Sequence, residues 1–255
     1  MHSNNMFAKL DANLNRTLNT YTKSIPVKAL CPDGKHKAAS FRYLSCLRSS
    51  ANHARTNQIP LLIFIFGHGK ASNHAINLGS DEAWLEMDHF RAAIGDGVAV
   101  TVVTTACFSG GWSVNPTLNI TTSAASGPKE YSESWNASDS IGRNCGSIYA
   151  TALIESMSQI SSSLFEGQTQ TETYNEFTRT IHRTLVTRID KFGNNHNIHF
   201  SAQNDEWSLS WTGRTGIPLA NFATRWAQLE TRPAASFSLC NRSPSAVGGG
   251  VLIRG

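Results

Sequence analysis

Two short apolar runs stand out in the pattern of hydrophobic and polar positions along the chain. Residues 61–66 are Leu, Leu, Ile, Phe, Ile and Phe, and residues 98–105 consist of Val, Ala and Thr. Short runs rich in β-branched or aromatic residues are typical of strands that are buried on both faces of a parallel sheet. Each run is followed by glycines, which allow the backbone to turn sharply. The pattern therefore predicts two buried strands that both end in tight loops.

Other segments carry apolar residues at helical spacing. The helix predicted over residues 82–94 lies between the two strands, so strand, helix and strand form a βαβ unit, which is right-handed in nearly all proteins. Further helices are predicted over 38–56, 147–160, 172–190 and from Pro218 to about residue 229.

The remaining pattern completes an α/β chain. A third strand is predicted over 118–125, and one or two more over 197–211, where Trp207 to Trp211 alternate between apolar and polar residues. Residues 126–146 are predicted to form a long polar loop. We divide the chain into a poorly defined segment (1–37), one α/β domain (38–231) and a flexible tail rich in Ser, Pro, Ala and Gly (232–255).

Composition narrows the class of protein. The chain has 255 residues, of which 40% are hydrophobic and 16% charged, as expected for a globular protein with a core. Its net charge is +4, but the basic residues are scattered, so nothing predicts nucleic acid as a partner. No apolar run reaches the roughly 18 residues of a membrane-spanning helix. Residues 1–25 lack the apolar region of a secretory signal, and the five cysteines are spread along the chain, so we expect reduced thiols and an intracellular location.

Two residues with catalytic chemistry follow the apolar runs. His68 lies between Gly67 and Gly69, and Cys107 follows the second run, 39 positions later. In open α/β sheets functional residues gather beyond the carboxyl ends of the strands, so we expect this pair to meet. A buried core cysteine is the alternative for Cys107.

Other sites at these loops are weaker interpretations. A zinc site would need a tighter cluster of ligands than His68, His74 and Cys107 offer, so we expect neither a metal nor a cofactor. His74 and His89 are interpreted as surface or helix residues. A serine hydrolase built on Ser109 lacks the Gly-x-Ser-x-Gly pattern of a nucleophile elbow.

The loop sequences resemble a known family. His68-Gly69, followed by Thr105-Ala106-Cys107-Phe108-Ser109-Gly110-Gly111, resembles the caspase-like cysteine peptidases and most closely the legumain family, which has Glu-Ala-Cys-Glu-Ser-Gly-Ser. Similar stretches follow at 121–125, 128–132 and 146–149, and the likeness covers residues 58–160. The Gln-Ala-Cys-x-Gly signature of caspases is absent. The resemblance implies a three-layer α/β sandwich with a mostly parallel sheet and helices on both faces.

The resemblance also implies a function. It makes the protein a cysteine endopeptidase that acts on a peptide or protein substrate, with Cys107 forming a thioacyl intermediate and His68 acting as general acid and base. The backbone amides of Gly69 and Cys107 would bind the oxyanion. Because such an acyl-enzyme can also be captured by an amine, a peptide transpeptidase or ligase is an alternative.

The substrate pocket departs from that of legumains. Phe108 replaces an acidic residue that lines the legumain specificity pocket, and Ser147 replaces an Asp. Ser132 is expected as a polar wall, with Trp135 nearby. Because both replacements remove charge, the resemblance does not carry over a strict preference for Asn or Asp at the cleavage site.

The first strand of the family is the largest departure. Residues 1–37 hold no clear equivalent, because residues 25–30 are short and contain Pro26, which restricts them to a sheet edge. A sandwich without its first strand, acting as an inactive pseudopeptidase that binds partners, is therefore a second alternative. The sequence leaves the oligomeric state open.

Overall fold

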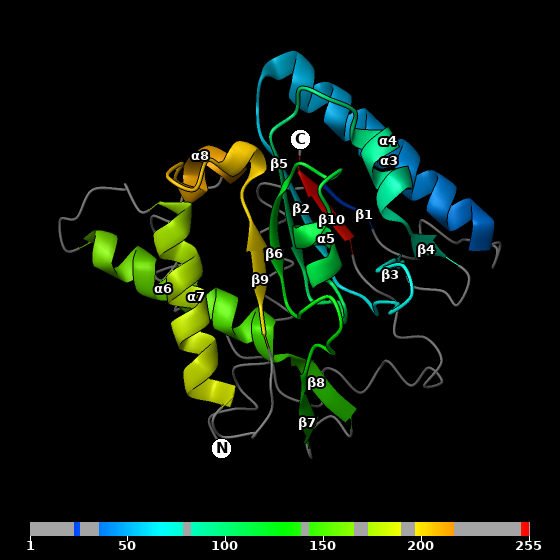
Figure 1. Cartoon of the computed structure of the whole chain (residues 1–255). Helices are drawn as coiled ribbons and strands as arrows, with labels where there is room; N and C mark the ends of the chain where they lie inside the picture. The colour runs from blue at the N-terminus through cyan, green and yellow to red at the C-terminus, as the bar shows by residue number, and fades with distance from the viewer. Residues whose placement is uncertain are drawn as a thin grey trace.

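A six-stranded sheet forms the centre of the molecule (Figure 1). A computed structural model describes residues 23–25, 36–78, 83–138, 143–165, 173–189, 197–216 and 251–254. The strand order is β1 (Lys23–Ile25), β10 (Val251–Arg254), β2 (Leu61–Ile65), β5 (Val100–Thr104), β6 (Thr121–Ala124) and β9 (His199–Ser201). The three strands β2, β5 and β6 are parallel, whereas β1, β10 and β9 run antiparallel to their neighbours. The sheet therefore has a parallel centre and antiparallel edges.

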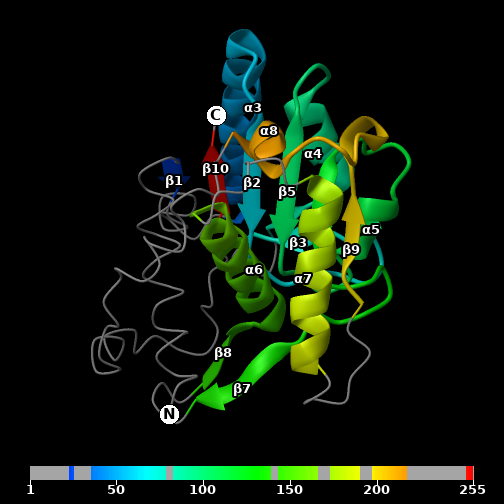
Figure 2. The same cartoon turned by 90° about the vertical axis from the view of Figure 1, so that its left-hand side faces the viewer.

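Helices cover both faces of this sheet. On one face lie α3 (His36–Asn57) and α4 (Met87–Ile94), and on the other lie α6 (Ile148–Phe165) and α7 (Tyr174–Ile189). Figure 2 shows α6 and α7 in front of the strands, with α3 behind them. Strand β2 explains this arrangement, because its residues alternate between the two apolar clusters: Leu61, Ile63 and Ile65 face α3, and Leu62 and Phe64 face α6 and α7.

The centre of the sheet also buries hydroxyl groups. Four residues of β5 and β6 that carry them, Thr101, Thr104, Thr121 and Thr122, are almost fully buried, as is Ser123. Several of these groups are paired: Ser123 bonds to Tyr149, and Arg214 donates to the Thr121 hydroxyl at 2.8 Å. Hydrogen bonding of this kind is what makes polar groups tolerable inside a core.

Smaller elements complete the fold. Two hairpins, β3 (Ile76–Asn77) with β4 (Trp84–Leu85) and β7 (Ser134–Ser138) with β8 (Arg143–Ser147), lie outside the main sheet. Short helices follow at α5 (Gly110–Val114), η1 (Gln203–Asp205) and α8 (Trp211–Thr215). Figure 2 places β7 and β8 below the ends toward which the arrows of β2 and β5 point.

The strands and long helices predicted from periodicity are confirmed. Strands β2, β5 and β6 lie within the predicted runs, β2 and β5 pair in parallel, and α3, α6 and α7 match the predicted helices within a few residues, except that α6 runs five residues further. The α/β class, with helices on both faces of the sheet, follows from these elements. Among the described residues, no helix is both long and apolar enough to cross a membrane.

Two predictions near the helices are wrong. The helix expected over 82–94 begins only at Met87, because Trp84 and Leu85 pair with the strand at Ile76 and Asn77. The predicted loop over 126–146 contains the hairpin of β7 and β8. Both of these strands are polar and irregular in register, so they carry no alternation of apolar residues.

Of the one or two strands predicted over 197–211, one is confirmed as β9, whereas the alternation from Trp207 to Trp211 forms no strand. These residues make turns and a single bridge between Ser210 and Thr173, after which α8 begins at Trp211. The Ser210 hydroxyl accepts a hydrogen bond from the Gly213 N–H and thereby starts the helix. Trp207 stacks on Tyr174 and Trp211 packs on Phe177, so both tryptophans are used in packing against α7.

A strand from the first part of the chain and a strand from the last part pair with each other in the sheet. Part of the segment expected to be a flexible tail, Val251–Arg254, forms β10 between β1 and β2, because Val251, Leu252 and Ile253 make a short apolar run suited to a strand. The expected absence of a first strand is qualified by β1, a three-residue strand at the edge of the sheet. The predicted helix over 218–229 and most of segments 1–37 and 232–255 lie outside the described residues.

Candidate functional site

The carboxyl ends of β2 and β5 bring the loops of His68 and Cys107 together. Leu61 faces Val100 and Ile65 faces Thr104, and this register continues beyond the strands, where the Thr105 N–H donates to the Ile65 carbonyl at 3.3 Å. The backbone of Gly69 then lies directly against that of Cys107, so closely that a Cβ at this glycine would overlap the Cys107 carbonyl oxygen. The predicted meeting of the two loops is therefore confirmed at the level of the backbone.

Cys107 is a half-buried free thiol that faces a third loop. The backbone N–H of Ser132 donates to Cys107 Sγ at 3.3 Å, and the Ser132 carbonyl oxygen lies 3.9 Å from the same sulfur. A backbone N–H at this position can stabilise negative charge on the sulfur. The Ser132 hydroxyl is buried and has no hydrogen-bond partner among the described residues. Ser132, which was expected as a polar wall of the substrate pocket, therefore contacts the thiol through its backbone.

His68 is an exposed residue of the loop that follows β2. Its carbonyl accepts from the Asn77 N–H at 2.8 Å, and the Lys70 N–H donates to the Ala75 carbonyl at 2.9 Å, so the loop is a narrow antiparallel ladder centred on Gly69. This pairing leaves the Gly69 N–H unused. Within the described part of the chain neither the Gly69 amide nor the Cys107 amide donates a hydrogen bond, and no side chain bonds to the His68 ring.

Phe108, which was expected to line the substrate pocket, follows Cys107 in an unusual backbone conformation. Its φ is 58°, an unusual value for a large side chain, and its ring is only 8% exposed. The ring packs edge-to-face against Tyr131, with 4.8 Å between centroids, and Tyr131 is 69% exposed. The buried Phe108 ring thus packs against the exposed Tyr131 ring. Tyr131, which was not predicted as a site residue, therefore forms the exposed aromatic surface beside the Cys107 loop.

Ser147 and Trp135 belong to the hairpin that follows Ser132. Ser147 ends β8 opposite Ser134, and its hydroxyl accepts a hydrogen bond from the Ala150 N–H at 3.4 Å, which caps α6. Trp135 faces Cys145 across the hairpin at an irregularity of the register. The topology brings both residues near Ser132, but no contact joins the Ser147 hydroxyl to Cys107 in the described residues.

Three polar residues around the Cys107 loop were missed. Ser126 donates to the Ala106 carbonyl at 3.1 Å, and the Glu130 carbonyl accepts from the Phe108 N–H at 2.7 Å. His74 Nδ1 lies 3.1 Å from the Phe108 carbonyl oxygen, although this residue was interpreted as a surface histidine. Single polar residues in loops carry no periodic signal, so only the three-dimensional structure reveals them.

The Glu130 side chain holds its own loop in place. It accepts hydrogen bonds from the Gly127 N–H at 3.3 Å and from the Asn197 N–H and side-chain amide at 3.2 and 2.8 Å. Partial burial disfavours the carboxylate, but the hydrogen bonds from Asn197 and Gly127, with His199 nearby, outweigh it and lower the pKa of Glu130 below its ordinary value of 4.5. An ionised Glu130 therefore stabilises the loop that ends at Ser132.

Other candidate sites are not supported by the arrangement. Ser109 is completely buried, with its hydroxyl 3.5 Å from that of Ser126, so it is not an accessible nucleophile. Among the described residues no three His, Cys, Asp or Glu side chains form a group that could hold a metal ion. A cleft of about 440 Å³ lies at the opposite edge of the sheet, at the amino ends of β5 and β6, where Val98, Thr121 and Gln203 line it.

Comparisons with known proteins add no relative. No protein-family model matches the chain. A search of curated proteins also found no match.

Proposed function

We propose that this protein is a cysteine peptidase of the caspase-like type, with Cys107 as nucleophile and His68 as general acid and base. The observation that carries the proposal is the contact of Gly69 with the Cys107 backbone, because it places the two loops at one edge of the sheet. Side by side beyond the carboxyl ends of parallel strands, the two residue types form an arrangement suited to acyl transfer. The resemblance of these loops to legumains supports the same reaction.

The reaction proceeds in two steps at these residues. The Cys107 thiolate attacks the scissile carbonyl carbon, and His68, in its protonated form, gives its proton to the departing amine as the C–N bond breaks. A thioester on Cys107 remains. His68 then takes a proton from water, which attacks the thioester and releases the acid product and the free thiol.

The unused amides provide the electrostatic support that this chemistry needs. The N–H groups of Gly69 and Cys107 are free to donate to the oxyanion of each tetrahedral intermediate, and such donors are worth about 10²- to 10³-fold in rate each. The Ser132 N–H, at 3.3 Å from the sulfur, stabilises the thiolate before attack. Loop positions from three segments thus share one reaction centre.

The surroundings of the thiol favour neutral substrate side chains. Phe108 packs on Tyr131 as an apolar aromatic pair beside the Cys107 loop, and Phe108 and Ser147 stand where legumains carry acidic residues. We therefore propose a preference for uncharged residues at the cleavage site, without the strict Asn or Asp requirement of legumains.

Peptide cleavage by matched variants tests this function. We would compare the parent with Cys107→Ala, His68→Ala and Cys46→Ala on a library of fluorogenic peptides, since Cys46 is the other half-buried free thiol of the described residues. Cys107→Ala and His68→Ala should lose activity by at least about 10³-fold, and Cys46→Ala should cleave like the parent. Equal cleavage by Cys107→Ala and the parent would exclude this mechanism.

A pseudopeptidase is the second candidate function. The observation in its favour is the exposed His68 ring, which no described side chain orients toward the sulfur. Under this alternative all four proteins leave every peptide intact, and iodoacetamide modifies Cys107 no faster than Cys46. Preferential modification of Cys107 without cleavage would instead indicate an active thiol that lacks its substrate.

A further inference from the structure

His74 connects the loop of His68 to the loop of Cys107. Its Nδ1 lies 3.1 Å from the Phe108 carbonyl oxygen, and its own carbonyl accepts a hydrogen bond from Trp112 Nε1 at 2.7 Å. Its ring lies so close to Gly111 that a Cβ there would overlap it. The His74 ring thus contacts Phe108 and Gly111, and its backbone carbonyl binds Trp112, so this one residue meets three residues that follow Cys107.

We propose that His74 is a positioning residue that fixes the Cys107 loop relative to the His68 loop. The inference rests on the proposed function, since it concerns the geometry of that reaction. His74 acts through Phe108 and Gly111 and contacts neither Cys107 Sγ nor the reacting bond. Its role is to hold the Cys107 backbone where the thiol and its amide can serve one carbonyl group.

The backbone shows that this contact is held against strain. His74 has φ of 57° and Phe108 has φ of 58°, a region that few residues other than Gly, Asn, Asp and His adopt and that carries backbone strain for any of them but Gly. The two strained residues are joined by the Nδ1 to carbonyl hydrogen bond. Because a carbonyl oxygen only accepts, Nδ1 must carry the proton, and this holds for both the neutral and the charged imidazole. The link is therefore independent of the charge of His74.

Trp112 connects the His74 backbone to the apolar core. Trp112, which donates to the His74 carbonyl, is fully buried and packs edge-on against Phe90 of α4, with 5.2 Å between ring centroids. Gly111 leaves the space that the imidazole occupies. A movement of His74 would therefore disturb a buried tryptophan as well as the turn after Cys107.

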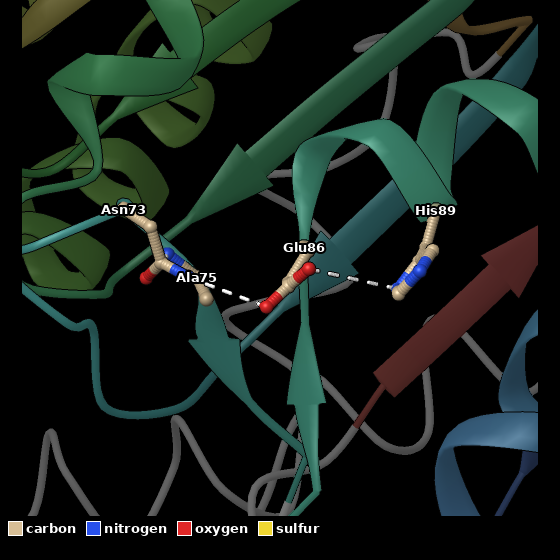
Figure 3. A network of polar contacts seen from close by, with 4 residues as sticks. All are labelled: Asn73, Ala75, Glu86 and His89. Atoms are coloured by element: carbon tan, nitrogen blue, oxygen red, sulfur yellow. Dashed lines mark hydrogen bonds and ion pairs between the residues drawn. The ribbon is translucent and has the colours of Figure 1, made fainter.

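The loop that carries His74 is also tied to the start of α4 (Figure 3). Asn73 accepts a hydrogen bond from the Ala75 N–H at 3.3 Å and donates to Glu86 at 3.4 Å. Glu86 precedes α4 and lies 3.9 Å from His89 Nδ1. His74 thus lies between two fixed supports, the helix on one side and the Cys107 turn on the other.

Substitutions at position 74 separate the hydrogen bond from the backbone strain. His74→Asn keeps a donor near the place of Nδ1 and tolerates positive φ, His74→Ala removes the donor and keeps the strain, and His74→Gly removes both. Gly111→Ala pushes the ring away without changing His74. The control is His182→Ala, because His182 is an exposed histidine of α7 outside these loops.

Two measurements are made on each variant: kcat and KM for a cleaved peptide, and the rate at which iodoacetamide modifies Cys107. We expect His74→Ala, His74→Gly and Gly111→Ala to lose about 10²-fold in kcat with little change in KM, as for a misplacement of about 1 Å, and to slow modification. His74→Asn should restore kcat to within about tenfold of the parent, and His182→Ala should match the parent.

Two results would overturn the inference. One is a His74→Gly protein that folds and keeps the kcat and the modification rate of the parent. The other is a folded His74→Asn protein that is as slow as His74→Ala in both readouts. If the parent itself cleaves nothing, the proposed function fails, and the modification rates alone decide whether His74 positions the thiol.

Discussion

Single backbone contacts determine the geometry at Cys107, and Gly69 makes the closest of them. We predict that Gly69→Ala lowers peptide cleavage by about 10²-fold or more, because the added methyl group must push the Cys107 carbonyl out of its place. Both kcat/KM and the midpoint of urea unfolding would be measured.

Gly213→Ala is the matched control for that change. Gly213 lies in α8, where the nearest atoms to an added Cβ belong to the side chains of Leu209 and Ser210. Here alanine should cost nothing in activity and add up to about 1 kcal/mol of stability through helix propensity. A Gly69→Ala protein with the kcat/KM of Gly213→Ala would show that the loops are not as tightly joined as described.

The carboxylate of Glu130 makes stability depend on pH in the acid range. Its pKa is lowered in the folded protein, so its stabilising effect is complete above the ordinary value of 4.5 and is lost as the pH falls through the folded pKa. We predict that Glu130→Gln destabilises the protein at about pH 7 and that this difference narrows by about pH 3, measured by urea unfolding at both pH values.

A second glutamate serves as control for the pH measurement. Glu155 of α6, which lies outside the Glu130 loop, is changed to Gln in the same way. A Glu130→Gln difference that stays constant with pH, or that grows in acid, would contradict the stabilising role of the carboxylate.

Some site residues could be predicted from the sequence, and others could not. His68, Gly69 and Cys107 follow apolar strands that pair in register, so the spacing of two buried runs was enough to bring them together. Phe108 and His74 depend on positive φ values and on contacts between loops, which no periodicity encodes. The meeting of these two loops was therefore visible in the sequence, and the contacts around them were not.

At the scale of elements, a side chain replaces a missing strand partner at the start of β5. The Gln203 amide donates to the Val98 carbonyl at 2.9 Å, and its oxygen accepts from the Val100 N–H at 2.8 Å. We predict that Gln203→Glu lowers the free energy of unfolding by about 1–3 kcal/mol, because a carboxylate keeps the acceptor but cannot donate to Val98. Urea unfolding at neutral pH measures the difference.

Gln159→Glu is the control, because it adds the same negative charge on the surface of a helix. Gln159 is an exposed residue of α6, so this substitution should alter stability by less than about 0.5 kcal/mol. Equal stabilities of the two variants would mean that the Gln203 bridge contributes nothing to the sheet.

The elements differ in how clearly the sequence encodes them. Strand β2 and helices α3 and α7 bury wide apolar surfaces, so their patterns are strong. The hairpin of β7 and β8 is built from polar residues paired through the backbone, and Trp207 packs on Tyr174 from a turn. Elements that lack a periodic pattern of apolar residues are therefore the ones that could not be predicted from the sequence.

At the scale of the whole molecule, β10 protects the most apolar strand of the sheet. It pairs with β2 from Arg254 opposite Leu62 to Val251 opposite Ile65, and thereby covers an edge whose sequence is Leu, Leu, Ile, Phe and Ile. Exposed apolar strand edges pair with other chains. We predict that Ile253→Pro, which removes a backbone donor from a strand paired on both sides, causes association of the protein, as measured by light scattering.

Ser24→Pro tests whether the position of the strand matters. Ser24 lies in β1, at the edge of the sheet, where proline is better tolerated. This variant should remain at the size of the parent. If Ile253→Pro also keeps that size and its stability, the edge of β2 does not depend on β10.

The buried hydroxyls of β5 and β6 affect how stability changes with temperature. Unfolding raises the heat capacity when apolar surface meets water and lowers it when polar surface does. When the protein unfolds, water reaches the buried hydroxyls of Thr101, Thr121 and Ser123 as well as the methyl groups of the sheet. The heat-capacity change on unfolding is therefore smaller than it would be for an all-aliphatic sheet of the same size. The stability curve is correspondingly flatter, so the fold loses less of its maximal stability on cooling than a variant with valine at these positions.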